Sequence, residues 1–142
     1  MKITKEFRWE MGHRLPFHSS GCENVHGHSY KLIVAVMGEP NEKGMIVDYQ
    51  EISDVVKPVI DQLDHSFLCQ ENDEAMKEFL VSENQKMVLV PFHSTAENIV
   101  KWLADQLAPI FKGRKNVSSL VLKLHETEKT SAEIKVTYME GV

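Results

Sequence analysis

Two long segments near the N-terminus alternate apolar and polar residues, and this alternation restricts the fold more than any other feature of the sequence. Within residues 2–14 one parity is apolar, with Ile3, Phe7, Trp9 and Met11. Residues 26–37 alternate in the same way, with Tyr30, Leu32, Val34 and Val36 on the apolar parity. A period of two is typical of a β-strand with one buried face. We therefore expect two long, half-buried strands.

After the two strands, a first segment has apolar residues at helical spacing. Asp48 and Glu51 have the spacing of a capping box, and the apolar stripe behind them extends to Leu63. Pro58 lies inside this stripe, so we expect a kink or a break in the helix near it.

A second helix is indicated more clearly. Ser94 and Glu97 form another predicted capping box, and an apolar stripe covers residues 99–110. Gly113 is a natural C-cap for this helix, because glycine adopts the left-handed conformation without strain.

Two more strands are expected near the end of the chain, over residues 117–126 and 132–139, and the short gap between them suggests a hairpin. Between the helices, residues 73–81 are compatible with a short helix and residues 86–90 with a short extended piece. This order predicts a single α+β domain over residues 1–142, with two main helices on one face of a four-stranded antiparallel sheet.

Charge and composition narrow the class of partner. The net charge of −5 shows no basic excess, which argues against nucleic acid or an anionic membrane. No apolar run is long enough to span a bilayer, and the first residues have no signal-peptide core. With only Cys22 and Cys69, a disulfide scaffold is not expected. We expect a cytoplasmic protein with reduced thiols, and a chain this short would gain from assembly into an oligomer.

Three histidines fall where the two N-terminal strands would bring them together. His26 and His28 are two residues apart, so they project from one face of their strand, the apolar one. His13 lies on the apolar parity of the preceding strand, at its end. If the strands pair as a hairpin, the three imidazoles meet on one face. Three neutral imidazoles suit Zn²⁺ and leave a fourth position open. An isolated His-x-His pair would more often face solvent or cap a turn; the third histidine favours the metal.

Cys22 precedes these histidines in a short polar loop, and two roles are open for it. It could be a fourth zinc ligand that closes a purely structural site. It could instead lie just outside the coordination sphere, with a thiol pKa lowered by the cation, and act as a base. The neighbouring Glu23 is a second candidate base.

Two further groups of residues carry ionisable side chains of interest. Asp64 and His65 are adjacent after the first helix, where an acid and an imidazole can pass a proton. Glu126 shares parity with the apolar residues of its strand, so its carboxylate needs a partner: a ligand with paired N–H donors, an arginine or backbone amides. The remaining histidines, interpreted as structural or surface residues, are His18, His93 and His125.

The order and spacing of these residues resemble the 6-pyruvoyl-tetrahydropterin synthase family, which includes the bacterial 6-carboxy-tetrahydropterin synthases of queuosine biosynthesis. The resemblance covers nearly the whole chain. It rests on His13, Cys22-x-x-x-His26-Gly27-His28, Asp64-His65, Thr95-Ala96-Glu97-Asn98 and Glu126-Thr127.

The resemblance implies the tunnelling fold, in which subunit sheets join into a barrel and trimers stack into hexamers with active sites at subunit interfaces. It also implies a zinc-dependent lyase acting on 7,8-dihydroneopterin triphosphate. By residue, it implies that His13, His26 and His28 are the zinc ligands. It also implies that Cys22 is the base that abstracts a proton, with Asp64 and His65 as its proton-relay partners, and that the Glu126 carboxylate anchors the pterin ring. Thr95 would be a further substrate-binding residue. The triphosphate-binding residues are not identified; Arg8, Arg14 and Lys129 are candidates because they are basic and near strand ends.

Two departures from the family pattern bear on the product. The Cys22-x-x-x-His26 spacing resembles the queuosine branch, which forms 6-carboxy-tetrahydropterin, whereas Glu23 stands where a further branch has a glutamate and forms 6-hydroxymethyl-dihydropterin for folate synthesis. A 6-pyruvoyl product would use the same groups. His93-Ser94 replaces the usual proline before Thr95. Outside this family, a structural-zinc binding module and a zinc hydrolase acting on purine-like rings, independent of Cys22, are the alternatives.

Overall fold

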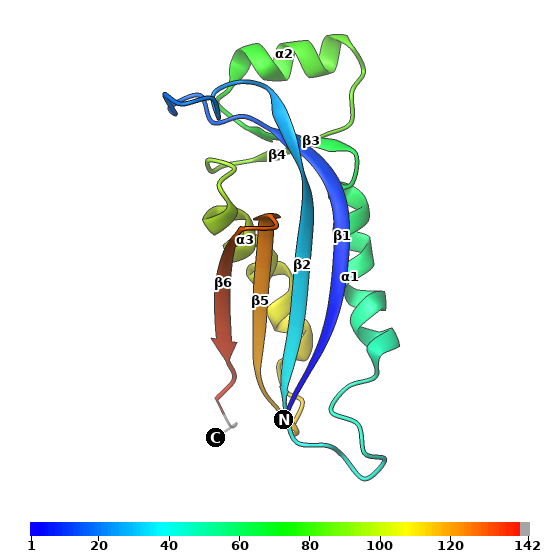
Figure 1. Cartoon of the computed structure of the whole chain (residues 1–142). Helices are drawn as coiled ribbons and strands as arrows, with labels where there is room; N and C mark the ends of the chain where they lie inside the picture. Colours follow the sequence, from blue (N-terminus) through cyan, green and yellow to red (C-terminus); the bar gives the residue numbers. More distant parts are fainter. Residues whose placement is uncertain (140–142) are drawn as a thin grey trace.

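The two N-terminal strands form one long antiparallel hairpin in the computed structural model, which describes residues 1–139 (Figure 1). β1 (Lys2–His13) pairs with β2 (His26–Gly38) without interruption, from Lys2 opposite Met37 to His13 opposite His26. The apolar parity of both strands is more buried than the other parity, which is mostly exposed in β1 and exposed or half-buried, with Ala35 buried, in β2. The predicted alternation and the predicted pairing are therefore confirmed.

The second half of the sheet is also a hairpin. β5 (Val117–Thr127) pairs antiparallel with β2, and β6 (Thr130–Thr137) pairs antiparallel with β5. These two strands were expected, and their apolar parity faces the same core as that of β1 and β2.

The prediction of a four-stranded antiparallel sheet is wrong, because the described sheet has six strands in the order β4-β3-β1-β2-β5-β6 and is mixed. β3 (Ser66–Gln70) runs parallel to β1, and β4 (Met87–Val90) runs parallel to β3. The first four residues of β3 are all buried, so the strand has no period-two alternation to reveal it. β4 matches the extended piece expected over residues 86–90.

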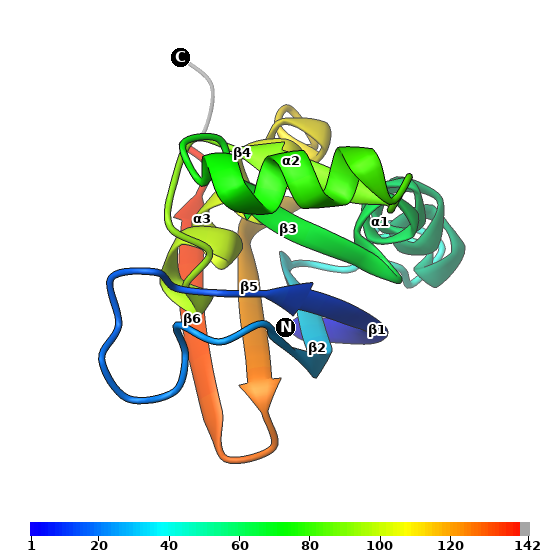
Figure 2. The same ribbon diagram turned by 90° about the horizontal axis from the view of Figure 1, so that it is seen from above.

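The two main helices share one core with the long strands. α1 (Tyr49–Leu63) and α3 (Ala96–Phe111) lie behind β1, β2, β5 and β6 in Figure 1 and bury their apolar stripes against them. α2 (Glu74–Ser82) joins β3 to β4 and, as Figure 2 shows, crosses over them, where Met76 and Leu80 pack on Phe67 and Cys69. None of the helices within residues 1–139 is both long and apolar enough to cross a membrane.

The ends of the helices differ in detail from the capping predictions. Asp48 is the N-cap of α1, as expected, and accepts a hydrogen bond from the Gln50 amide at 2.8 Å. α1 continues through Pro58, so the helix is not broken there. The predicted cap of α3 at Ser94 is wrong: Thr95 accepts from the Asn98 amide at 3.2 Å. Gly113 follows the end of α3 with a φ of 87°, the left-handed conformation that glycine tolerates.

Candidate metal centre

The β1–β2 hairpin brings three histidines to one end of the sheet, on its buried face. His13 lies opposite His26 in the strand register, and His28 follows on the same face of β2. The ring centroids are 4.6 Å apart for His13 and His26, 5.2 Å for His13 and His28, and 5.0 Å for His26 and His28. One ring nitrogen of each lies within 4.8 Å of those of the other two. The predicted convergence is confirmed.

Backbone carbonyls determine which nitrogens of two histidines face the centre of the cluster. His13 Nδ1 lies 2.8 Å from the Ser94 carbonyl oxygen, and His26 Nδ1 lies 2.7 Å from the Asn24 carbonyl oxygen. Because a carbonyl only accepts, each Nδ1 carries the proton and each Nε2 presents a lone pair. Orientation of a ligand histidine through its outer nitrogen is typical of metal sites.

The inner nitrogens fit a bound cation. Within residues 1–139, the buried Nε2 atoms of His13 and His28 have no hydrogen-bond partner. Burial lowers the pKa of His13 to about 4, with smaller contributions from His26 and His28. Burial also lowers the pKa of His28, against the opposing effect of Glu126. At neutral pH these two imidazoles are therefore neutral, as a metal ligand must be. Three nitrogen donors of this kind suit Zn²⁺.

Glu126 closes the cluster from the end of β5. Its Oε1 lies 3.0 Å from His28 Nε2, outside hydrogen-bond geometry, and 4.0 Å from His13 Nε2. The sequence predicted a carboxylate on the apolar face that needs a partner. Among the described residues the nearest partners are these two histidines, rather than an arginine or backbone amides.

Ser94 is a site residue that the sequence interpretation missed. It is buried, and both its carbonyl oxygen and its hydroxyl, the latter at 3.2 Å, lie within reach of His13 Nδ1. The next residue, Thr95, a predicted substrate contact, uses its hydroxyl to cap α3. The segment before α3 therefore orients a histidine, a role for which the local sequence holds no signal.

Cys22 and Glu23 lie in the loop of residues 14–25, which projects from the histidine end of the hairpin (Figure 1). The loop is closed by a hydrogen bond from the Leu15 amide to the Cys22 carbonyl at 2.7 Å. Cys22 is half-buried and Glu23 is exposed. Cys22 does not belong to the group of possible ligands that the three histidines form in the described chain. This arrangement does not favour a closed four-ligand zinc site.

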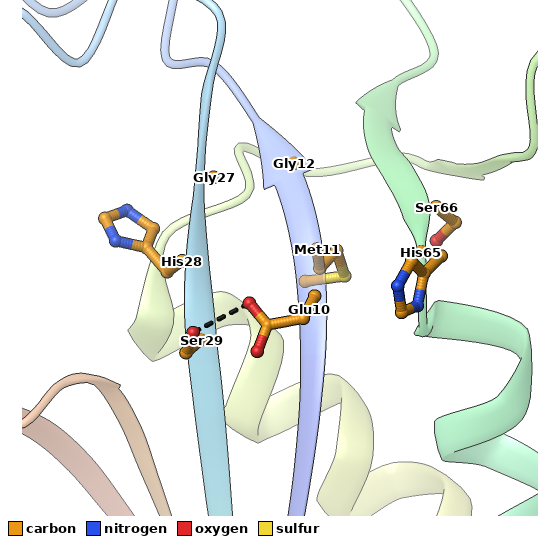
Figure 3. A pocket seen from close by; sticks show the side chains of 8 residues that line it. All are labelled: Glu10, Met11, Gly12, Gly27, His28, Ser29, His65 and Ser66. Atoms are coloured by element: carbon orange, nitrogen blue, oxygen red, sulfur yellow. Dashed lines mark hydrogen bonds between the residues drawn. The ribbon is translucent and has the colours of Figure 1, made fainter.

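Asp64 and His65 form a pair on the other side of β1. Asp64 Oδ1 lies 2.9 Å from His65 Nδ1 and accepts from the Glu10 amide at 3.0 Å. That hydrogen bond is the main reason why the pKa of Asp64 is lowered. His65 lines a pocket of about 410 Å³ and is 77% exposed. His28 also lines this pocket, but in Figure 3 β2 and β1 lie between the ring of His65 and that of His28.

Comparison with known proteins identifies the group to which this arrangement belongs. The sequence profile described as 6-pyruvoyl tetrahydropterin synthase matches residues 2–136. The chain belongs to this synthase family. The resemblance noted from the motifs is thus confirmed.

Relatives within the synthase family include proteins named 6-carboxy-5,6,7,8-tetrahydropterin synthase. One from Haemophilus influenzae is 34% identical, covering 93% of this chain and 96% of its own. A protein from Pyrococcus abyssi, named a putative enzyme of the same type, is 31% identical and covers 94% and 88%.

Solved structures share the fold. The Plasmodium vivax 6-pyruvoyltetrahydropterin synthase has a TM-score of 0.77 at 21% identity, covering 96% of this chain and 98% of its own. An uncharacterised protein from Wolinella succinogenes, WS1659, has a TM-score of 0.80 at 24% identity, covering 94% and 97%.

In this member of the synthase family, Tyr30 lies beside the histidines on the same face of β2. Its ring stands edge-on to His28, at 5.6 Å and 86°, and to His13, at 6.3 Å and 81°. Trp9 stacks on it at 5.5 Å. Burial, helped by the charge of Glu126, raises the pKa of Tyr30, so its hydroxyl keeps its proton.

Proposed function

We propose that this chain is a zinc-dependent lyase that converts 7,8-dihydroneopterin triphosphate to 6-carboxy-5,6,7,8-tetrahydropterin, a step of queuosine biosynthesis. The observation that carries the proposal is the cluster of His13, His26 and His28, with inner nitrogens left free for a cation. The relatives of that name, about a third identical over most of the chain, support the choice of pterin chemistry.

The three histidines would hold the zinc, which when bound would polarise the side-chain oxygens of the substrate. Glu126, at the rim of the cluster, would bind the guanidine-like edge of the pterin ring, because a carboxylate accepts two parallel N–H donors. Together these residues would fix the ring and the side chain at once, which is the positioning that proton transfer requires.

Cys22 would act as the base that takes a proton from the substrate's side chain. Its loop begins and ends at the ligand strands, and a thiol beside a cation has a lowered pKa. Asp64 and His65 would relay protons, and because one chain holds them apart from the histidine cluster, they would come from a neighbouring subunit. The 6-carboxy product requires elimination of triphosphate, uptake of one water molecule and loss of two side-chain carbons as acetaldehyde.

A second product is favoured by Glu23. It is exposed in the same loop as Cys22 and adjacent to it, so it would be a second base beside Cys22. A base at that position would support cleavage of the side chain to 6-hydroxymethyl-7,8-dihydropterin, for folate synthesis. The catalytic residue of the Plasmodium vivax protein of the same fold is a glutamate. A 6-pyruvoyl product, by contrast, has no residue of its own in this chain to favour it.

The test is product analysis by mass spectrometry on 7,8-dihydroneopterin triphosphate, with zinc content measured on the same samples. We expect the wild type to form the 6-carboxy product. Cys22→Ala should keep its zinc and lose turnover by about 10²-fold or more. Glu23→Ala should remove only the hydroxymethyl product. Cys69→Ala, at the other cysteine, is the matched control and should retain turnover.

Three results would contradict the proposal. Loss of zinc and of the fold in Cys22→Ala would indicate a structural-zinc module. Full activity of Cys22→Ala would indicate a different zinc enzyme, such as a hydrolase that uses zinc-bound water. Absence of hydroxymethyl-dihydropterin from every reaction would remove the second product.

A further inference from the structure

Tyr30 has a buried hydroxyl without a hydrogen-bond partner, although it lies beside the candidate metal centre. The residue is fully buried, and within residues 1–139 its oxygen meets no donor or acceptor. A buried hydroxyl left unpaired destabilises a fold, so such a group in a site usually meets its partner in another state of that site.

The strand register places a candidate acceptor near it. The β2–β5 ladder ends at Lys31 opposite His125, so Tyr30 and Glu126 are the residues that come just beyond this last pair on their two strands. Both side chains lie beside His28: the Tyr30 ring is 5.6 Å from the His28 ring, and Glu126 Oε1 is 3.0 Å from His28 Nε2. The charge of Glu126 is close enough to act on the phenol.

The nearest neighbour of the Glu126 carboxylate is a histidine of the cluster. Its Oε1 lies 3.0 Å from His28 Nε2. When a metal takes the Nε2 lone pairs of the histidines, none of these nitrogens can donate to the carboxylate, which forms no hydrogen bond with them in this structure either. The Glu126 carboxylate then lacks a donor among the histidines, and the nearby Tyr30 hydroxyl lacks an acceptor.

We propose that Tyr30 is a positioning residue of the metal-bound state, in which its hydroxyl donates a hydrogen bond to the Glu126 carboxylate. The bond holds Glu126 away from the histidines and in the place from which it would bind the pterin edge. The Tyr30 ring, edge-on to His13 and His28, supports both imidazoles independently of the hydroxyl. This inference rests on the metal centre of the proposed function, and not on which pterin is formed.

The consequence is a zinc affinity that depends on Tyr30 only when Glu126 is present. A hydrogen bond to a charged group that forms only in the zinc-bound state adds to zinc affinity. Tyr30→Phe keeps the ring and removes the hydroxyl, so it should weaken zinc binding by about tenfold. In a Glu126→Ala background the same change should have no further effect, because the acceptor is already gone.

The experiment is a double-mutant cycle on zinc affinity, measured by competition with a chelator for the wild type, Tyr30→Phe, Glu126→Ala and the double variant. Tyr138→Phe is the matched control: it removes a hydroxyl that donates to the Ala108 carbonyl at 2.7 Å, outside the histidine cluster, and should leave zinc affinity unchanged. Relative to the wild type, Tyr30→Phe should raise KM for the pterin triphosphate while kcat changes little.

The outcomes separate this inference from the proposed function. Equal effects of Tyr30→Phe in both backgrounds, or none in either, overturn the Tyr30–Glu126 bond while the zinc site stands. A wild type that binds no zinc overturns both. If zinc were lost only because the protein unfolds, the melting temperature would fall. Tyr30→Phe removes an unpaired hydroxyl, so it should not lower the melting temperature measured without zinc.

Discussion

His13 combines full burial with a hydrogen bond that fixes its protonated nitrogen. The strand parity predicted that this residue faces the core, and the structure places it there. The same parity could not reveal Ser94, whose carbonyl binds His13 Nδ1 although it lies 81 residues further along the chain. Alternation along a strand predicts the direction of a side chain, whereas the partners it meets from a loop depend on the tertiary fold.

Removal of His13 tests the metal centre most directly. We expect His13→Ala to lower zinc affinity by at least about 100-fold, because it removes one of the three ligands. The Ser94 carbonyl binds Nδ1 of this ligand, so its Nε2 lone pair is directed at the metal. Zinc content after dialysis against a weak chelator measures the loss. His18→Ala is the control, since His18 contacts Ser20 within its own loop. Equal zinc content in both variants would place the metal elsewhere.

At the scale of the elements, what could be predicted depended on how each strand is buried. β1, β2, β5 and β6 each pack one face on the core, so their sequences alternate and they were predicted. β3 is buried along its length and only five residues long, so Ser66–Gln70 carries no period. Its neighbour β1 comes from a distant part of the chain and β4 follows only after α2, and local sequence does not record such parallel pairing.

Gly27 explains how closely the two ligand strands approach. A Cβ at this position would lie 3.0 Å from the Met11 carbonyl oxygen, between the two histidines of β2. Gly27→Ala should therefore move β2 against β1 by a few tenths of an ångström and lower zinc affinity by about tenfold, since metal distances tolerate about 0.2 Å. Chelator competition measures the affinity.

Gly38 provides the control at the far end of the same strand. A Cβ there would collide with the backbone oxygen of Asn116. Gly38→Ala should lower the free energy of unfolding by about 1–3 kcal/mol without lowering the zinc affinity of the folded protein. If both alanine variants lowered zinc affinity equally, the effect would be general destabilisation and not the spacing of the ligand strands.

The attachment of α2 to β1 should depend on pH. Arg14 donates to Asp73, the N-cap of α2, with 2.7 Å between Nε and Oδ2, and this bond lowers the pKa of Asp73. The lowered pKa means that the stabilisation is complete above the unfolded pKa of about 4 and is lost as the pH falls below it. Asp73→Asn keeps a capping side chain and should lower the free energy of unfolding by about 2 kcal/mol at pH 7.

Urea unfolding between pH 7 and pH 3 measures this effect. The difference between the wild type and Asp73→Asn should shrink as the pH falls below about 4, because the carboxyl of the unfolded wild type takes up a proton first and that of the folded protein follows below its lowered pKa. Glu74→Gln, one residue further along the exposed first turn of α2, should show a much smaller difference at pH 7. A difference between the wild type and Asp73→Asn that is constant with pH would show that the ion pair contributes nothing.

At the scale of the whole molecule, one chain contains the proposed catalytic groups without assembling them. Cys22 and the histidines lie at the end of the β1–β2 hairpin, whereas Asp64 and His65 lie beyond β1, next to β3. Within residues 1–139 no hydrogen bond or ion pair joins the Asp64–His65 pair to Cys22. If all these groups serve one reaction, the site must form between subunits, as expected for the proposed stacked trimers.

Subunit mixing tests this shared site. Cys22→Ala and His65→Ala should each be inactive alone, because every interface lacks one group. After equal amounts are mixed and the subunits exchange, half of the chains supply an intact Cys22 and half an intact His65, so about a quarter of the interfaces are complete. Activity on 7,8-dihydroneopterin triphosphate should then recover to about a quarter of the wild-type value. Mixing Cys22→Ala with His13→Ala should restore none, because these two residues belong to one chain's half of the site. No recovery in the first mixture, despite exchange shown by differently tagged subunits, would mean that Cys22 and His65 act within a single chain.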